Sequence, residues 1–424
     1  MTKIEKIKYI IIGNSAGGIG AAEAIREVDK AGAITMVSDE PYPAYSRPLI
    51  SEYLAGGYSL ERMLFRPADF YEKNNIRTFL GKKVGRLDTD SHIIELDDGS
   101  RITWERLLLA TGGLPIVPRL KGAEKRGVFT FTTLDDAKAI DQSLNGPAQA
   151  VVIGGGLIGV SVTEALVKRG VKVTVVEMKE HILNTILDEE ASALEEAALR
   201  QAGVSIVTSH TVVEINSDSL EKTPSSVILD DGSTIPCNLV VVAIGVQPRT
   251  ELVSGTRIKV NRGIVVDRYM STSIPDVYAC GDAVEAYDFV YGQNRAIPIW
   301  PNAYIGGRTA GFNMTGIPTE YQDGTAMNSL KYFGLAVVSA GILTPPDDGY
   351  EVLSRKYDHS YKKVVLKDGL VVGMVFASDI EKSGIIFSLM KDRVNVDGFK
   401  QALITDDFSL VSLPEEIWRP RLEM

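Results

Sequence analysis

The sequence has 424 residues, of which 45% are hydrophobic and 24% are charged, as in an ordinary globular protein. This length exceeds what one hydrophobic core usually serves, so we expect two or three domains. Its 45 basic and 55 acidic residues give a net charge of −10, which argues against nucleic acid or an anionic membrane as a partner. An acidic protein partner would need a local basic patch on this chain.

Targeting and metal-binding signals are missing from the sequence. The apolar run before Gly13 is too short for a signal peptide, and the chain has no run of about 18 apolar residues. The two cysteines, Cys237 and Cys280, are too far apart for a redox Cys-x-x-Cys pair, and they cannot supply an iron–sulfur or zinc ligand set. We therefore expect a cytoplasmic protein with no membrane segment and no metal site.

A β-rich run over residues 7–12 leads into a glycine-rich turn, a helix through about Val28 and a strand over residues 34–37. Such a unit is typical of a dinucleotide-binding fold, in which amides at the helix N-terminus face the phosphates. The fingerprint reads G-x-S-x-x-G, and its small serine still permits close approach of a phosphate. The acid after the strand is Asp39 or Glu40, and strand phase favours Asp39 as the one nearest the ribose. The other candidate cofactor residues of this unit are Gly13, Ser15, Ala16 and Gly18.

Residues 150–177 repeat the unit with a complete G-x-G-x-x-G fingerprint. Its glycines serve the tight turn, the close approach to a pyrophosphate and the close packing of the helix on the strand. At the end of the second strand, Glu177 would accept hydrogen bonds from a ribose 2′-hydroxyl and repel a 2′-phosphate, which predicts NAD(H). Two such units suggest two nucleotides, so FAD is the expected occupant of the first. The candidate NAD(H)-binding residues are Gly154, Gly156, Leu157, Ile158, Gly159 and Glu177.

Two further segments, 107–115 and 239–248, each consist of an apolar strand that ends in a small-residue turn. Both suit a chain that crosses between two nucleotide domains, and both are also compatible with ordinary strand ends. Between them we expect a helix over about 134–144 and strands over 204–207 and 227–229, which would complete the sheet of the second unit. The candidate cofactor residues here are Ala110, Thr111, Gly112 and Gly245.

The chain then returns to the first unit. A strand over residues 277–279 runs into Cys280, Gly281 and Asp282, and we expect a helix after the aromatic stretch 300–304. An aspartate at the carboxyl end of a parallel strand points into the crevice where ligands of such sheets bind. Gly281 and Asp282 are therefore candidates for contact with the polyol of FAD, and the alternative is a surface turn.

From about Thr325 the pattern changes to alternating strands over 329–333, 336–339, 350–357, 361–367 and 370–376, followed by a helix over about 381–391. The Lys367–Leu370 turn predicts a hairpin. The predicted fold is thus an α/β protein with two Rossmann-like domains, the FAD domain being interrupted by the NAD domain, plus a C-terminal α+β domain with an antiparallel sheet. The expected bounds are 1–114 and 246–322 for the FAD domain, 115–245 for the NAD(H) domain and 323–424 for the C-terminal domain.

Over nearly its whole length the chain resembles the FAD-dependent pyridine nucleotide-disulfide oxidoreductase superfamily. The resemblance rests on the paired fingerprints, the two crossings, the T-x-x-P-x-V-Y-A-x-G-D stretch over residues 272–282 and the C-terminal domain. The segment Pro43–Ser51 is similar to that of NADH:rubredoxin reductases, ferredoxin reductases and the flavin half of nitrite reductases. This resemblance implies that Ser46, Arg47 and Pro48 lie beside the FAD; for Arg47, a surface ion pair is the alternative.

Departures from the superfamily bear on the mechanism. The helix that carries the redox cysteine pair in disulfide reductases corresponds here to residues 45–53, which contain no cysteine, so a disulfide relay is excluded. Related reductases also tend to carry a lysine where Glu52 stands and a glutamate where Ser161 stands, and the two form a pair beside the flavin. Either the flavin environment is altered here, or Glu164 or Glu52 takes over a carboxylate role.

The resemblance implies an enzyme in which hydride passes from NADH to flavin N5 and electrons then pass to a protein carrier, rubredoxin or ferredoxin, or to a partner iron–sulfur subunit. One alternative is an NADH oxidase that forms hydrogen peroxide. Another is an NADH-responsive flavoprotein that serves as a binding or regulatory module. We assign no catalytic side chain, because the cofactors carry the chemistry, and we expect the C-terminal domain to be the surface of any homodimer.

Overall fold

The computed structural model describes residues 6–144, 146, 148–217, 223–322, 324–357 and 359–422. These residues form two compact units, each assembled from separate stretches of the chain. Unit 1 comprises Met1–Ile116, Thr132–Ala137 and Gly245–Thr325. Unit 2 comprises Val117–Phe131, Lys138–Ile244 and Ala326–Met424. The division into three domains with the bounds given above stays a prediction.

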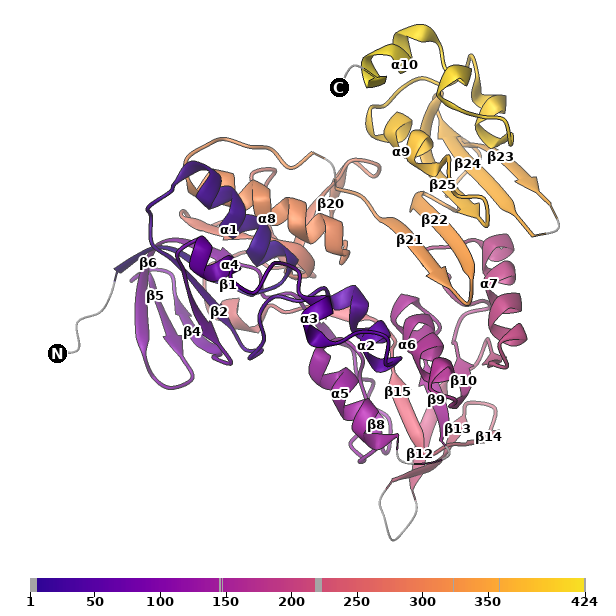
Figure 1. The fold of residues 1–424 in the computed structure, drawn as a ribbon, viewed down its shortest axis with the longest axis horizontal. Coiled ribbons are helices and arrows are strands. Elements are labelled where there is room, and N and C mark those ends of the chain that lie inside the picture. Colours follow the sequence, from indigo (N-terminus) through magenta and orange to yellow (C-terminus); the bar gives the residue numbers. More distant parts are fainter. Residues whose placement is uncertain are drawn as a thin grey trace. The chain divides into compact units, whose positions relative to one another are not determined.

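Unit 1 is built on a mixed sheet whose parallel part holds the first glycine turn (Figure 1). The order is β3-β2-β1-β6-β5-β4, and β18 pairs in parallel with residues 107–109 of β6, beyond the residues that pair with β5. Strands β1, β2 and β6 are fully buried near their carboxyl ends, as expected for strands covered on both faces, whereas β3 at the edge of the sheet is only partly buried there. Their bounds are β1 Lys6–Ile12, β2 Ile34–Ser38, β3 Ile76–Leu80, β6 Arg101–Leu109 and β18 Val277–Ala279, and the antiparallel strands are β4 Val84–Asp88 and β5 Ile93–Leu96.

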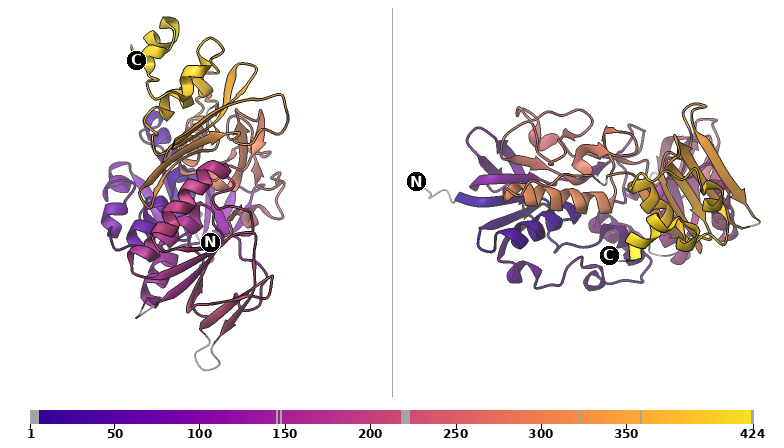
Figure 2. Two further views of the ribbon diagram at one scale, coloured as in Figure 1. Left: turned by 90° about the vertical axis from the view of Figure 1, so that its right-hand side faces the viewer. Right: turned by 90° about the horizontal axis from the view of Figure 1, so that it is seen from above.

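Helices α1 (Ala16–Val28) and α8 (Trp300–Met314) run side by side against this sheet (Figure 1, Figure 2). Small residues allow the close approach, because a Cβ added at Gly307 would lie 2.0 Å from the carbonyl oxygen of Gly17. The aromatic stretch 300–304 forms the first turn of α8, so the prediction that the helix follows this stretch was wrong. Pro301 suits that place, because the missing amide of a proline is not needed in a first helical turn.

The remaining elements of unit 1 are short. A small sheet joins β17 (Ile264–Val265), β19 (Val284–Asp288) and β20 (Gln293–Arg295), while β7 (Gly113–Pro115) pairs with β16 (Val246–Pro248). The short helices are η1 Arg47–Leu49, α2 Ile50–Leu54, α3 Leu60–Met63, α4 Phe70–Lys73, η2 Glu251–Val253 and η3 Gly281–Ala283.

Unit 2 contains a second parallel sheet, with the order β11-β10-β9-β15-β8. The prediction that residues 227–229 complete this sheet was wrong, because they belong to β13 (Pro224–Leu229) in a separate antiparallel sheet with β12 (Val212–Ser217) and β14 (Thr234–Pro236). The parallel strands are β8 Val128–Phe129, β9 Gln149–Ile153, β10 Lys172–Val176, β11 Ser205–Val207 and β15 Leu239–Val242, and the helices are α6 Leu157–Lys168 and α7 Glu189–Gln201. Helix α5, Leu134–Ser143, contains residues of both units, with the division after Ala137.

The C-terminal part of unit 2 is a five-stranded antiparallel sheet in the order β21-β22-β25-β24-β23. At the β24–β25 hairpin, Asp368 and Gly369 both have positive φ angles, of 51° and 74°, as a type I′ turn requires. The elements are β21 Met327–Tyr332, β22 Leu335–Gly341, β23 Glu351–Lys356, β24 Tyr361–Lys367, β25 Leu370–Ala377, α9 Ser383–Lys391, η4 Lys400–Ile404, η5 Leu410–Ser412 and α10 Glu415–Leu422.

Candidate functional site: two dinucleotide cradles

The first glycine turn, in unit 1, joins β1 to α1. Gly13 has a φ of +121°, which favours glycine, and its amide donates to the carbonyl of Val37 at 2.8 Å. A Cβ added at Gly18 would lie 2.0 Å from the carbonyl oxygen of Gly13, so this position needs glycine for the helix to approach the strand. Ser15 is the N-cap of α1, but its side chain makes no capping hydrogen bond. The amides of the first turn, at Ala16 and beyond, are therefore not capped by this side chain and suit phosphate oxygens.

The second glycine turn, in unit 2, repeats this geometry between β9 and α6. Gly154 has a φ of +105° and donates to the carbonyl of Val176 at 2.8 Å. A Cβ at Gly159 would lie 1.9 Å from the carbonyl oxygen of Gly154, while no atom lies within 4 Å of a Cβ at Gly156. Gly156 thus leaves open space where a pyrophosphate can approach. Leu157 and Ile158 form the first turn of α6.

Glu177 lies directly after β10 and is only 8% exposed. Its carboxylate accepts hydrogen bonds from the amide of Gly155 at 2.7 Å and from the amide of Lys179 at 2.9 Å. Two amides on two different segments fix the orientation of this side chain. The carboxylate therefore stands at the edge of the second glycine turn, where an NAD(H) ribose is expected.

The two units differ at the position where unit 2 has the acid Glu177, directly after β10. Gly13 and Gly154 bond to Val37 and Val176, so the residue that corresponds to Glu177 in unit 1 is Ser38, and Asp39 lies one position further along the chain.

A cavity of about 320 Å³ in unit 1 opens beside the first glycine turn. It contains Asp39 but not Glu40, whose carboxylate instead accepts from the hydroxyl of Tyr45 at 2.6 Å and pairs with Arg47. Of the two acids that the sequence left open, Asp39 is thus the one that faces the cavity. The lining residues are Ile12, Gly13, Val37, Ser38, Asp39, Lys82, Lys83, Val84, Gly85, Thr111, Leu114, Arg249, Glu251 and Leu252.

The structure adds Arg249 to the candidate residues. Its guanidinium lies 2.6 Å from a carboxylate oxygen of Asp39, at the wall of this cavity. Nothing in the local sequence pattern indicates the pairing, because the two residues are 210 positions apart. The sequence feature that could have pointed to Arg249 is its position directly after the predicted crossing segment, at Val246–Pro248.

The crossing segments meet in unit 1 beside the same cavity. Strands β7 and β16 pair antiparallel, and the amide of Arg249 donates to the carbonyl of Gly112 at 2.9 Å. The hydroxyl of Thr111 donates to the carbonyl of Arg249 at 2.9 Å. Ala110 donates to the carbonyl of Ile12 at 2.8 Å, and Gly245 has a φ of +125° where the chain enters β16.

Arg47 begins the short helix η1, with Pro48 in its first turn. Its guanidinium donates to the carbonyl of Thr132 at 3.0 Å and pairs with Glu40. Burial lowers the pKa of Arg47, but Tyr45, Glu40 and Asp282 more than offset this, so the pKa is raised and the side chain stays charged.

Asp282 lies in η3, directly after β18. Burial raises the pKa of its carboxyl group, and the positive charge of Arg47 opposes that shift. Arg47 and Asp282 are close enough for the charge of each to shift the pKa of the other. Such a pair of one positive and one acidic group suits a polar ligand that both donates and accepts hydrogen bonds.

The two cysteines of the described residues offer no redox chemistry. Cys237 and Cys280 are buried and unpaired. Burial raises the pKa of each thiol to about 12, so neither is a thiolate at neutral pH.

Ser161 and Glu164, which the sequence singled out, both face β21 and the turn after it within unit 2. Ser161 is hydrogen-bonded to the hydroxyl of Tyr332. Glu164 accepts from the amide of Phe333 at 2.8 Å and pairs with Lys168 at 3.3 Å. Glu52 lies in the first turn of α2 in unit 1. A role for Glu164 or Glu52 beside the flavin stays a prediction.

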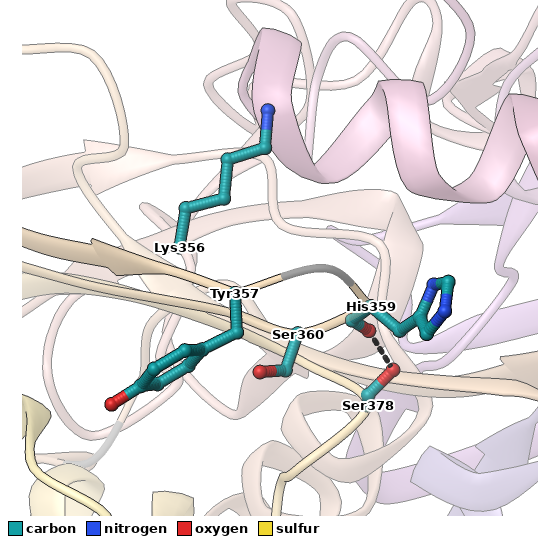
Figure 3. A pocket seen from close by; sticks show the side chains of 5 residues that line it. All are labelled: Lys356, Tyr357, His359, Ser360 and Ser378. Carbon is teal, nitrogen blue, oxygen red and sulfur yellow. Dashed lines mark hydrogen bonds between the residues drawn. The ribbon is translucent and has the colours of Figure 1, made fainter.

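Two other features of the described residues lie outside the two glycine turns. A surface hollow near the β23–β24 turn is lined by Lys356, Tyr357, His359, Ser360 and Ser378, but Figure 3 shows that the side chains of Lys356, Tyr357 and His359 diverge. Lys356 pairs with Glu190 on α7. Half-buried His210 lies with the exposed Asp230 and Asp231, and its Nδ1 is 2.9 Å from a carboxylate oxygen of Asp230, as in an ordinary surface hydrogen bond.

This combination of fold and site defines a class of protein, a two-dinucleotide oxidoreductase without a redox disulfide. Residues 7–307 match the family described as pyridine nucleotide-disulphide oxidoreductase, and residues 327–394 match the rubredoxin NAD+ reductase C-terminal domain. The chain belongs to the pyridine nucleotide-disulphide oxidoreductase family. Its cofactors are FAD and NAD(H).

Three similar proteins illustrate the range of this family. The chain is 31% identical to the epsilon subunit of NADH-dependent phenylglyoxylate dehydrogenase of Aromatoleum evansii, over 98% of this chain and 99% of that one. It is 31% identical to nitrite reductase [NAD(P)H] of Bacillus subtilis strain 168, over 92% of this chain but only 48% of that protein. A crystal structure of a covalent putidaredoxin reductase–putidaredoxin complex superimposes with a TM-score of 0.87 and 25% identity, covering 99% of both chains.

The comparisons confirm the predicted family, fold class, enzymatic nature and cofactors. No helix in the described ranges is both long and apolar enough to cross a membrane.

Proposed function

We propose that this protein takes electrons from NADH and delivers them, by way of FAD, to a protein acceptor. The acceptor is a small carrier of the rubredoxin or ferredoxin type, or an iron–sulfur subunit of a larger enzyme. The observation that carries the proposal is the pair of glycine turns, one beside Glu177 and one beside the cavity of Asp39, in a chain whose cysteines are buried. Bound FAD would supply the acceptor for the hydride of NADH and the transfer of single electrons, so no protein thiol would be needed.

The residues of unit 1 would hold FAD. The amides of the first turn of α1 bind its phosphates, after the turn at Gly13, while Asp39 accepts hydrogen bonds from its adenosine ribose. Asp282 meets the polyol, and Arg47 supplies a positive charge beside the isoalloxazine or the pyrophosphate. The residues that complete this assignment are Ser15, Ala16, Gly18, Pro48, Ala110, Thr111, Gly112 and Gly281.

The residues of unit 2 would hold NADH. The turn of Gly154, Gly156 and Gly159 and the first turn of α6, at Leu157 and Ile158, bind the pyrophosphate. Gly245 serves the crossing that returns the chain to unit 1. The oriented carboxylate of Glu177 accepts from the ribose 2′-hydroxyl and repels the 2′-phosphate of NADPH.

The protein is also proposed to associate with other protein chains. The C-terminal antiparallel sheet is our candidate surface for a homodimer, and the whole-length match to a subunit of a larger dehydrogenase supports a role as an electron-input subunit. The cytoplasmic location rests on the sequence and stays a prediction.

Rapid mixing of the flavin-loaded protein with NADH in the absence of oxygen tests the proposal. We expect the yellow absorbance to bleach within milliseconds to seconds and to recover when oxidised ferredoxin or rubredoxin is added. Oxygen uptake measured in parallel should be much slower than carrier reduction. A colourless protein that cannot bind flavin would contradict the proposal.

The same experiment separates the two alternatives. Rapid oxygen uptake with stoichiometric hydrogen peroxide and no carrier reduction would identify an NADH oxidase. Slow bleaching with little turnover on any acceptor would identify an NADH-responsive binding module.

A further inference from the structure

We propose that Arg249 is a positioning residue of the FAD site, which orients Asp39 for the adenosine ribose and links that contact to the two chain crossings. This inference rests on the proposed function, because it assumes that FAD occupies the cavity of unit 1. It goes beyond that function by assigning a role to a residue outside both glycine motifs.

Arg249 and Asp39 form a short ion pair at the wall of the cavity. Nη1 of Arg249 lies 2.6 Å from Oδ2 of Asp39, and both side chains line the 320 Å³ cavity. They are 33% and 42% exposed, so the pair is partly shielded from solvent. A charge-assisted hydrogen bond of this length restricts the rotation of the carboxylate. The carboxylate is therefore oriented before a ligand arrives, which lowers the entropic cost of binding.

Arg249 also offsets the negative charge of Asp39, which would otherwise oppose the binding of FAD. FAD carries a diphosphate, and a carboxylate close to it raises the free energy of the bound state through repulsion. The guanidinium of Arg249 neutralises the charge of Asp39 while it leaves the other carboxylate oxygen, Oδ1, to accept from a ribose hydroxyl. An arginine suits this task because it stays charged at every relevant pH.

The backbone of Arg249 is hydrogen-bonded to the crossing segment of residues 107–115. Its amide donates to the carbonyl of Gly112, and its carbonyl accepts from the hydroxyl of Thr111, both at 2.9 Å. These contacts join the segment that leaves unit 1 to the segment that returns to it. Arg249 therefore connects Asp39 to both crossings through one residue. Occupation of the ribose site should make residues 110–116 and 245–250 more rigid.

Release of FAD from the loaded enzyme on dilution, followed by flavin fluorescence, tests the positioning role. We expect R249A to raise the FAD Kd about tenfold, the size of one charge-assisted hydrogen bond. R249K should recover part of the affinity, because it restores the charge without the fork geometry. The matched control is R257A, which removes another unit 1 arginine that pairs with an aspartate, in this case the exposed Asp90, and which should leave the Kd unchanged.

A double-mutant cycle separates positioning from a merely structural effect. D39N and R249A should be strongly non-additive in the FAD Kd, because each alone breaks the same contact. Additive losses, or a wild-type Kd in R249A, would overturn the inference. If wild-type protein itself binds no FAD, the proposed function fails, and that outcome is distinct from a failure of the Arg249 role.

Hydrogen exchange tests the link to the crossings and does not depend on turnover. In the wild type, FAD should slow amide exchange in residues 110–116 and 245–250 as well as in the glycine turn. In FAD-saturated R249A the slowing should persist at residues 13–18 and shrink at the crossings. Equal slowing at the crossings in both proteins would overturn the link.

Discussion

The carboxylate of Glu177 is held by the amides of Gly155 and Lys179, so its orientation does not depend on a bound nucleotide. We expect E177A to lower the ratio of kcat/KM for NADH to that for NADPH by about tenfold or more, because the repulsion of the 2′-phosphate disappears. The measurement is steady-state kinetics with both nucleotides. E177Q is the conservative variant, which keeps an acceptor for the Gly155 amide but loses the charge. It should therefore also lower the preference for NADH over NADPH, while it disturbs the glycine turn less than E177A does. Unchanged selectivity in both variants would refute the role of Glu177.

Asp282 offers a second test at the scale of one side chain. Its carboxyl group lies after β18, where burial raises its pKa and Arg47 counteracts the shift. We expect D282A to lose FAD during purification, with roughly tenfold weaker retention, since a hydrogen bond to a charged group is removed. The flavin content per protein is measured by absorbance. D282N, which can still bond a hydroxyl, should retain more, and a fully yellow D282A would argue against the assignment.

The buried thiols lead to a prediction of insensitivity. Cys237 and Cys280 have a pKa of about 12 and are buried, so iodoacetamide should leave NADH turnover unchanged at pH 7 to 8. The control is the same treatment in denaturant, after which mass spectrometry should find both thiols alkylated. Loss of activity in step with alkylation of the native protein would show that a cysteine takes part.

At the scale of elements, helix α7 carries an unusual acid. Glu195 is 0% exposed, and neither of its carboxylate oxygens has a hydrogen-bond partner. Burial, and then the nearby charge of Glu164, raise its pKa from 4.5 to about 8. The groups near it are Glu164 with its partner Lys168 and the hydroxyl of Tyr332.

The sign of the resulting pH effect follows from proton linkage. Below pH 4.5 the carboxyl group is protonated in the folded and the unfolded chain, whereas between 4.5 and 8 only the folded state keeps the proton. Stability should therefore fall as pH rises through this window, by at most about 1.4 kcal/mol per pH unit from this group. We expect E195Q to flatten the decline in Tm between pH 5 and pH 8. E189Q, at an exposed position of the same helix, should not flatten it.

Some of the helices and strands could be predicted from the sequence, and others could not. Strands β1 and β9 and the helices after them follow from local patterns, because the glycine turn and the periodicity lie within one short stretch. The sheet to which β13 belongs does not follow from local patterns, because alternating hydrophobic residues identify a strand but not the strands with which it pairs. For α8, the proline at its first turn was the signal that the prediction did not use. At the cofactor cavity, Asp39 was favoured from strand phase, but Arg249 reaches it only through the long-range return of the chain.

For the whole molecule, duplication made the architecture predictable. Two fingerprints, at Gly13 and Gly154, indicate two parallel sheets, and the change to alternating strands near Thr325 indicates the third region. These sequence patterns do not predict which acceptor binds or where it docks, because an acceptor is recognised by the shape and charge of a surface that is built from distant segments of the chain.

The discontinuity of unit 1 has a consequence for biosynthesis. The parallel sheet of unit 2 has all its strands once Val242 has been synthesised, whereas unit 1 still lacks β18 and α8, which ends at Met314. On the ribosome the second nucleotide fold can therefore close first, while the earlier-made β1 and α1 wait for late segments of the nascent chain. Flavin uptake should accordingly begin only after about three quarters of the polypeptide has emerged, and a chain terminated before α8 should never turn yellow.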